Sequence, residues 1–108
     1  MDDLLSACVR ATGSDTELVW VPEGDLAAAG AEPWTQLPCW VQESGEFAGF
    51  LEKDTSLAAA TGLVCRPVEE TVRDTWDWVR REGLPPQRED RPVHGLPTEL
   101  EQQLLANH

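Results

Sequence analysis

Hydrophobic residues near the start of the chain recur at intervals of three and four, which is the spacing of one helix face. The pattern predicts a first helix that begins at Asp2 or Asp3 and continues through Thr12. An aspartate in front of the helix would accept hydrogen bonds from its free amide groups, and Gly13 would end it in a left-handed conformation. Its apolar stripe consists of Leu4, Leu5, Cys8, Val9 and Thr12.

A longer helical pattern runs from Val68 to Glu82 without glycine or proline. Its first turn is acidic and its last turn is basic, an order that complements the helix dipole, and Gly83 follows as the stop. The apolar face is formed by Val68, Val72, Thr75 or Trp76, and Val79. Of the two tryptophans Trp76 and Trp78, we expect one in the core and the other at its edge.

Three shorter helices are predicted from weaker patterns. Residues 25–29 and 56–61 are alanine-rich or preceded by capping residues, and each stretch is followed by a glycine. Near the end of the chain, residues 98–101 have the spacing of a capping box, in which a threonine and a glutamate three positions later satisfy two free amides. The apolar side of this last helix consists of Leu100 and Leu104, with Leu105 beside them.

Three short apolar runs have the composition of strands. Residues 18–21 and 63–66 are largely apolar and β-branched, and Pro22 and Pro67 end them, while residues 50–52 form a second, shorter candidate. We therefore predict an α+β fold, with three or four helices packed on a small sheet of two or three short strands and without a Rossmann domain. The order in which the strands pair cannot be derived from the sequence.

The stretch from residue 31 to residue 48 shows no period, because prolines and glycines interrupt it. It nevertheless contains Trp34, Trp40 and Phe47, and Phe50 follows closely. A loop with so much aromatic surface must lie against the core of its own domain, a ligand or a partner. The aromatic side chains of residues 31–48 therefore belong either to the core or to a binding surface.

Length and charge narrow the classes of function. The chain has 108 residues, which suits one small domain, and a formal net charge of −12. Nucleic acids and anionic membranes bind surfaces rich in Lys and Arg, so neither is an expected partner. No apolar run approaches the ~20 residues of a membrane span. We divide the chain into a domain at 1–83 and a proline-rich, extended tail at 84–108 that carries the short terminal helix.

Cysteine usage and the N-terminal residues bear on the cellular compartment. Cys8, Cys39 and Cys65 are odd in number and far apart, and they form no C-x-x-C pair. This spacing argues against a disulfide framework and against a zinc site. The residues after Met1 are acidic, whereas a secretory signal begins with basic residues. We therefore expect free thiols, no bound metal and a cytoplasmic location.

The sequence contains few residues that could carry out catalysis. Tyrosine is absent, Lys53 is the only lysine, and no glycine motif of a phosphate-binding loop is present. His94, in the proline-rich tail, is either a solvated or capping residue, a general base or a metal ligand. Arg66 interrupts an apolar run and either pairs with a carboxylate or contacts an anion. We assign no catalytic residue.

Three stretches have a recognisable order. They are Glu32-Pro33-Trp34-Thr35-Gln36-Leu37-Pro38, then Asp54-Thr55-Ser56-Leu57-Ala58-Ala59-Ala60-Thr61-Gly62-Leu63, and finally Arg66-Pro67 followed by Val68-Glu69-Glu70-Thr71-Val72-Arg73-Asp74-Thr75-Trp76-Asp77-Trp78. Together they resemble the C-terminal third of NAD(P)-dependent epimerase/dehydratase proteins, the extended short-chain dehydrogenase/reductases. The resemblance covers residues 3–82, and the helix motif at its end is its most specific part.

The resemblance implies a substrate-binding lobe without its catalytic domain. The family's chemistry uses a glycine-rich Rossmann turn and a Tyr-x-x-x-Lys pair, and neither can be mapped onto this sequence. It follows that NAD(P) belongs only to a full-length relative, that this chain binds no cofactor alone, and that it has no dehydrogenase or epimerase activity by itself. By position, the substrate-facing residues would be Trp34, Trp40, Phe47, Phe50 and Arg66, and we add His94 from the tail.

Three functions are compatible with these observations. The first is a separate or truncated substrate-binding lobe, which would bind a small-molecule substrate and pair with a Rossmann-domain subunit or with a second copy. The second is a small cofactor-free enzyme, such as an isomerase or cyclase, that reuses the substrate cleft for acid–base chemistry. The third is a dimeric interaction protein whose tail exchanges between copies.

Overall fold

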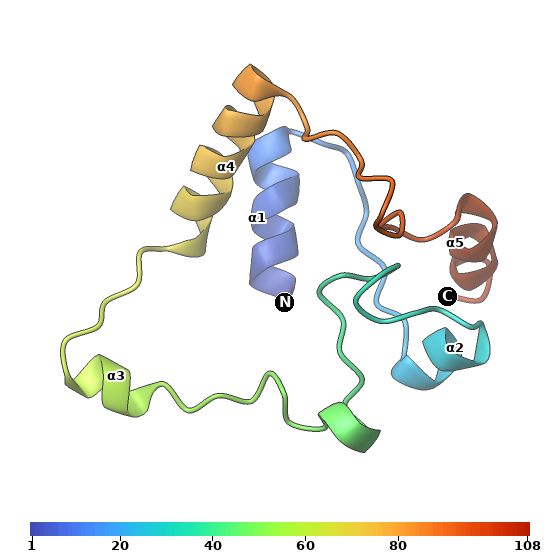
Figure 1. The fold of residues 1–108 in the computed structure, drawn as a ribbon, viewed down its shortest axis with the longest axis horizontal. Coiled ribbons are helices and arrows are strands. Elements are labelled where there is room, and N and C mark those ends of the chain that lie inside the picture. Colours follow the sequence, from blue (N-terminus) through green and yellow to red (C-terminus); the bar gives the residue numbers. More distant parts are fainter. The chain divides into compact units, whose positions relative to one another are not determined.

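The computed structural model describes all residues from 1 to 108 and is helical. Five α-helices are present, joined by long irregular segments, with one short 3₁₀ helix between the second and third (Figure 1). The helices are α1 (Asp2–Thr12), α2 (Glu23–Ala28), α3 (Ser56–Ala60), α4 (Val68–Glu82) and α5 (Thr98–Leu105), and the 3₁₀ helix is η1 (Gly45–Phe47). No helix is both long enough and apolar enough to cross a membrane.

The predicted small sheet is wrong, and with it the α+β class. The structure contains no strand, and its only β-type pairing is an isolated bridge between Pro33 and Leu37. Residues 18–21 and 63–66 are irregular, and residues 50–52 lie in and directly after a turn. A short apolar run is compatible with a strand, but a strand also needs a neighbour to complete its backbone hydrogen bonds, and a local pattern does not reveal that neighbour.

The prolines after the two apolar runs begin helices instead of ending strands. Pro22 and Pro67 occupy the N-cap positions of α2 and α4, and Pro97 does the same for α5. Proline suits the start of a helix because its missing amide hydrogen would find no partner there. The capping predictions at Asp2 or Asp3 and at Thr98 are wrong, since no side chain caps α1 or α5.

Contacts divide the chain into two compact units. The first unit comprises Met1–Leu18 and Thr55–Pro86, and the second comprises Val19–Asp54 and Gln87–His108. Both units are therefore assembled from two separate stretches of the sequence. The division into a domain at 1–83 and a tail at 84–108 stays a prediction.

The first unit contains a pair of helices, α1 and α4, that lie against each other (Figure 1). Ala7 is buried, and the residues predicted for the two apolar faces are half-buried, except for Thr12 and Thr75, which are exposed. Trp76 is half-buried and Trp78 is 46% exposed, so Trp76 is the more buried of the two, but neither lies in a fully buried core as the sequence predicted for one of them. Arg10 adds an exposed ion pair to Glu69 at 3.1 Å.

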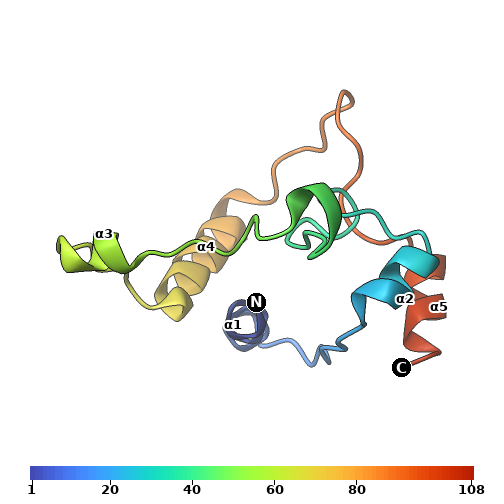
Figure 2. The ribbon, with the colours of Figure 1, turned by 90° about the horizontal axis from the view of Figure 1, so that it is seen from below.

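The second unit has a small core in which residues far apart in the sequence meet. Leu26 of α2, Ala31 after it and Leu104 of α5 are buried together. The helices α2 and α5 lie side by side there (Figure 2). Half-buried side chains surround this cluster, namely Val21, Ala29, Leu37, Trp40, Leu96 and Leu100. The terminal helix therefore supplies part of the core, as its predicted apolar side indicated.

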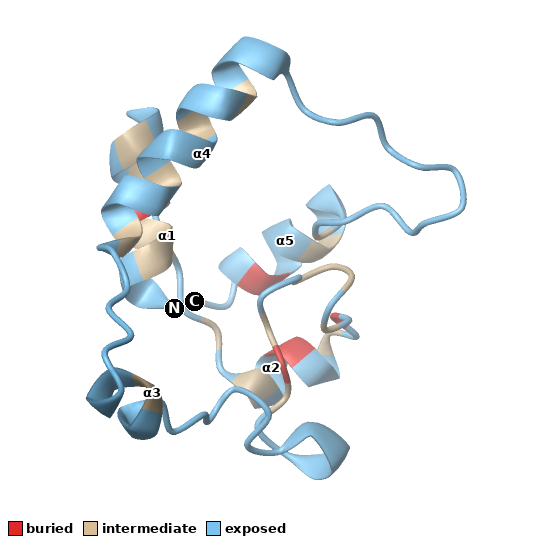
Figure 3. Cartoon of the chain, turned by 60° about the vertical axis from the view of Figure 1, so that its left-hand side comes forward, coloured by how far each residue is buried: buried red, intermediate tan, exposed pale blue.

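Little of the chain is fully buried. Only Ala7, Leu26, Ala31, Val41 and Leu104 are buried, and no polar side chain is (Figure 3). Several large apolar side chains are exposed instead, among them Trp34, Phe47 and Phe50. Large exposed apolar side chains that lie together are typical of surfaces that contact a ligand or another protein.

Candidate functional site

Three of the predicted binding residues form one aromatic cluster in the second unit. The ring centroids of Trp34 and Phe50 are 5.3 Å apart, those of Trp34 and Phe47 are 6.2 Å apart, and those of Phe47 and Phe50 are 6.3 Å apart. Their planes meet at 73° to 86°, so the three rings are nearly perpendicular to one another. This is a favourable geometry for aromatic pairs. The three side chains are 43%, 44% and 45% exposed, so the cluster lies at the surface.

A tight turn holds Trp34 in the cluster. The amide of Thr35 donates to the carbonyl of Pro33 at 2.7 Å, which closes a three-residue turn around Trp34. Trp34 adopts a φ of 65° and is the only non-glycine residue with a positive φ. A left-handed conformation at such a large residue costs on the order of 1–2 kcal/mol, so the surrounding hydrogen bonds must impose it. They include the amides of Gln36 and Leu37, which both donate to the carbonyl of Glu32.

Two further turns place Phe47 and Phe50 on the same side of their loop. Phe47 ends η1, and the amide of Phe50 donates to the carbonyl of Phe47 at 3.0 Å. Gly49 lies between them with a φ of 72°, which a glycine adopts without strain. The chain therefore reverses its direction between Phe47 and Phe50, and the two phenyl rings come into contact.

The carboxylate of Glu23 on α2 anchors the start of this loop. Its Oε2 accepts a hydrogen bond from the backbone amide of Glu43 at 2.7 Å, and its Oε1 accepts one from the hydroxyl of Ser44 at 2.9 Å. Both oxygens are therefore used, and the carboxylate joins the first turn of α2 to the residues that precede η1. Hydrogen bonds to a charged acceptor are stronger than neutral ones.

We expect the substitution Glu23→Gln to loosen this loop. It removes the charge and one acceptor, which should cost about 1 kcal/mol, so the amide of Glu43 should exchange its hydrogen ~5-fold faster. Hydrogen exchange followed by NMR measures this directly. Glu32→Gln is the matched control, because the same chemical change occurs in the same unit at a side chain without a hydrogen bond, and equal acceleration in both variants would contradict the anchoring role.

Charged side chains surround the aromatic cluster. The ammonium group of Lys53 lies 5.5 Å from the centroid of the Phe50 ring, within range of a cation–π interaction. A hollow of about 120 Å³ adjoins Phe47 and Phe50, and Glu43 and Glu52 also line it. The site therefore combines aromatic faces with negative charge.

The other candidate residues lie elsewhere. Trp40 packs on the core formed around Leu26, and is thus a structural residue of the second unit. Arg66 belongs to the first unit, where it is ion-paired with Asp74 and its Nε donates to the hydroxyl of Thr71 at 2.9 Å. Pairing with a carboxylate is the plainer of the two interpretations given for Arg66. The structure does not join these residues to the cluster.

His94 lies next to the turn that carries Trp34. Its Nδ1 is 3.3 Å from the carbonyl oxygen of Thr35, which also accepts a hydrogen bond from the amide of Gly95 at 3.3 Å. The predicted tail thus contacts the aromatic segment of its own unit. Nearby, Arg88 makes two hydrogen bonds to Asp90, and this guanidinium lowers the pKa of the Asp90 carboxyl group from its ordinary value.

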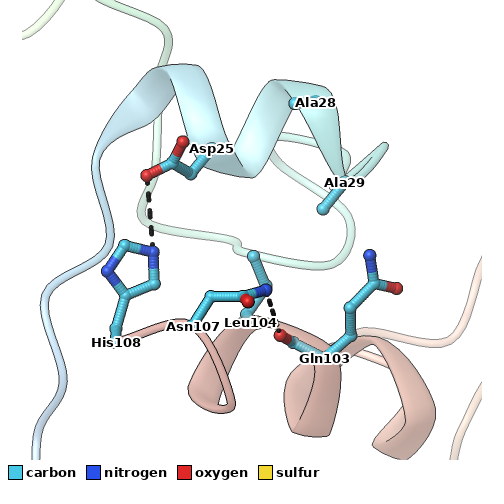
Figure 4. A pocket seen from close by; sticks show the side chains of 7 residues that line it. All are labelled: Asp25, Ala28, Ala29, Gln103, Leu104, Asn107 and His108. Carbon is cyan, nitrogen blue, oxygen red and sulfur yellow. Dashed lines mark hydrogen bonds and ion pairs between the residues drawn. The ribbon is translucent and has the colours of Figure 1, made fainter.

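A second, larger hollow lies between parts of α2 and α5. It has a volume of about 260 Å³, and Figure 4 shows Ala28 and Ala29 on one wall and Gln103 and Asn107 on the other. At its end, Nε2 of His108 lies 3.4 Å from Oδ2 of Asp25, which makes an ion pair when the imidazole is protonated. This hollow lacks the aromatic side chains that distinguish the first site.

Three contributors to the aromatic site escaped the sequence analysis. Glu23 gave no signal, because its partners lie 20 and 21 positions away. Lys53 was conspicuous only as the sole lysine, and Glu52 only as an acidic residue beside the aromatic stretch. Comparison with protein-family models, with curated proteins and with solved structures finds no match.

Proposed function

We propose that this chain is the substrate-binding lobe of an epimerase/dehydratase-like oxidoreductase. In this proposal it acts beside a dinucleotide-binding domain that lies in another polypeptide or in another part of a longer protein. The stretches quoted for residues 32–38, 54–63 and 66–78 support this assignment, because they resemble that lobe in order and in residue type. A cytoplasmic location would follow from it.

The exposed aromatic cluster is the observation on which the proposal rests. Trp34, Phe47 and Phe50 are held together by specific turns, yet each remains more than two-fifths exposed. A group of rings that only stabilised the fold would be buried more completely. Aromatic walls with a few polar groups are typical of small-molecule sites, so the cluster suits one wall of a substrate cleft.

The proposed lobe contributes binding and leaves the chemistry to its partner. The chain has no tyrosine, and its single lysine lies on the Phe50 ring. A proton-transferring Tyr-x-x-x-Lys pair would therefore have to come from the dinucleotide-binding domain. The lobe would raise the rate of the reaction by holding the substrate in a reactive orientation, without taking part in the chemical step itself.

Co-expression tests this proposal. The gene neighbourhood is searched for a frame that encodes a dinucleotide-binding domain, and the two chains are purified together and separately. We expect a stable complex whose NADH or NADPH fluorescence changes on binding, whereas this chain alone should leave that fluorescence unchanged. Cofactor binding by this chain alone, or failure of the two chains to associate, would contradict the proposal, and native mass spectrometry would then report whether the chain pairs with itself.

A further inference from the structure

The hollow at the aromatic cluster has the chemistry of a cation site. Phe47 and Phe50 line it together with the acidic residues Glu43 and Glu52. Neither carboxylate takes part in an ion pair. Aromatic faces and carboxylates both attract positive charge, and the apolar rings also favour alkyl groups over water.

A cation of the protein itself already uses this surface. The Lys53 ammonium stands 5.5 Å from the Phe50 centroid, although flexible lysine side chains at a surface are free to extend into water. The position of this side chain indicates that the Phe50 face attracts an ammonium group. Lys53 belongs to the same loop as Phe50, so its ammonium group contacts the ring when no ligand is bound. A ligand that binds the ring more strongly could displace it.

The arrangement of the rings suits a rounded cation more than a flat one. The planes of Phe47 and Phe50, which both line the hollow, meet at 86°, so a rounded group in the hollow could contact both residues. Alkylated ammonium groups are recognised in this way, because their charge is spread over methyl groups that pack on the rings. A flat group such as a purine would instead stack on a single ring.

The negative charge of the second unit also favours a cation over an anion. Its only basic residues are Lys53, Arg88 and Arg91, and Arg88 is paired with Asp90. Acidic residues occur along both of its stretches, so the local potential is negative and repels phosphates and carboxylates. An anionic ligand would have to overcome this potential, whereas a cation would be attracted by it.

We propose that the hollow beside Phe47 and Phe50 binds an alkylammonium group, and that this group is part of the small-molecule substrate. Only the second half of this statement rests on the proposed function; the first half concerns the chain alone. Lys53 acts as an internal competitor that covers Phe50 until the ligand arrives. The carboxylates of Glu43 and Glu52 provide the charge that the rings lack.

A pair of isosteric probes tests the proposal on the native chain. Choline carries a trimethylammonium group, and 3,3-dimethylbutan-1-ol has the same shape with a neutral carbon in place of the nitrogen. Titration is followed by NMR at the indole of Trp34 and the ring of Phe50. We expect choline to bind about tenfold more tightly than its neutral analogue. Equal binding of both probes, or binding of neither, would overturn the proposal.

Two variants then test the role of the lysine. Lys53→Met removes the competing ammonium and should strengthen choline binding ~3-fold. Arg91→Met is the control, because it removes the same charge from the same unit without uncovering a ring. If both variants change choline binding equally, only net charge is involved and the proposed competition is wrong. If the chain binds choline but forms no complex with a dinucleotide-binding domain in the co-expression test, the cation site stands and the oxidoreductase lobe is rejected, so the two proposals can fail separately.

Discussion

Replacement of Trp76 by alanine should separate α1 from α4. Trp76 is half-buried on the face of α4 that packs on α1, and this helix pair supplies the tertiary contacts between named elements in the first unit. Loss of a packed tryptophan costs 3–5 kcal/mol in a full core, so we expect about 2–3 kcal/mol at this partly exposed position. Because α1 has only 11 residues, it should not remain helical once its neighbour detaches.

Urea denaturation followed by circular dichroism measures this effect, and hydrogen exchange locates it. The amides of α1 should lose their protection in Trp76→Ala. Trp78→Ala is the matched control, because it makes the same change two positions away on the same helix, at a side chain that is 46% exposed. We expect the control to change the free energy of unfolding by less than about 0.5 kcal/mol. Equal destabilisation by the two substitutions would show that the packing of α4 has been misassigned.

The helices were the part of the fold that local patterns could predict. The bounds of α4 agree with the predicted 68–82, and α1 ends before Gly13, which has a φ of 65° as expected of a helix stop. An amphipathic helix completes its own backbone hydrogen bonds, so its sequence period contains most of the necessary information. A strand at 18–21 or 63–66 would instead need a neighbouring strand to complete its hydrogen bonds, and both runs are irregular. Val64, in the second run, is 88% exposed.

The sequence predicted that aromatic residues form the site, but only some of the positions that it indicated belong to it. Trp34 and Phe47 stood out because aromatic residues in an irregular stretch must contact something, whereas Phe50 became a candidate only through the family resemblance. The three rings contact one another in the structure. Trp40 shared that signal, but it packs on a core that includes Leu104, 64 positions further along the chain. Contacts over such a separation leave no local pattern, so core and surface tryptophans looked alike in the sequence.

Replacement of Leu104 by alanine should release α5 from the second unit. Leu104 is 5% exposed and packs with Leu26 and Ala31, so its removal leaves a cavity where two distant stretches of the chain meet. Leucine-to-alanine changes in cores cost 2–5 kcal/mol, and this core has few other members to close the gap, so we expect about 3 kcal/mol. An eight-residue helix without this contact should fray, because isolated helices of that length are marginal in water.

The neighbouring Leu105 provides the control, since it is 46% exposed on the same turn of α5. Leu105→Ala should leave the urea midpoint nearly unchanged, whereas Leu104→Ala should lower it and remove the protection of the α5 amides from exchange. The indole resonance of Trp40 should also shift in Leu104→Ala, because this ring packs on the same cluster. A Trp40 signal that stays in place would mean that α5 contributes nothing to the core, and the second unit would then consist of Val19–Asp54 alone.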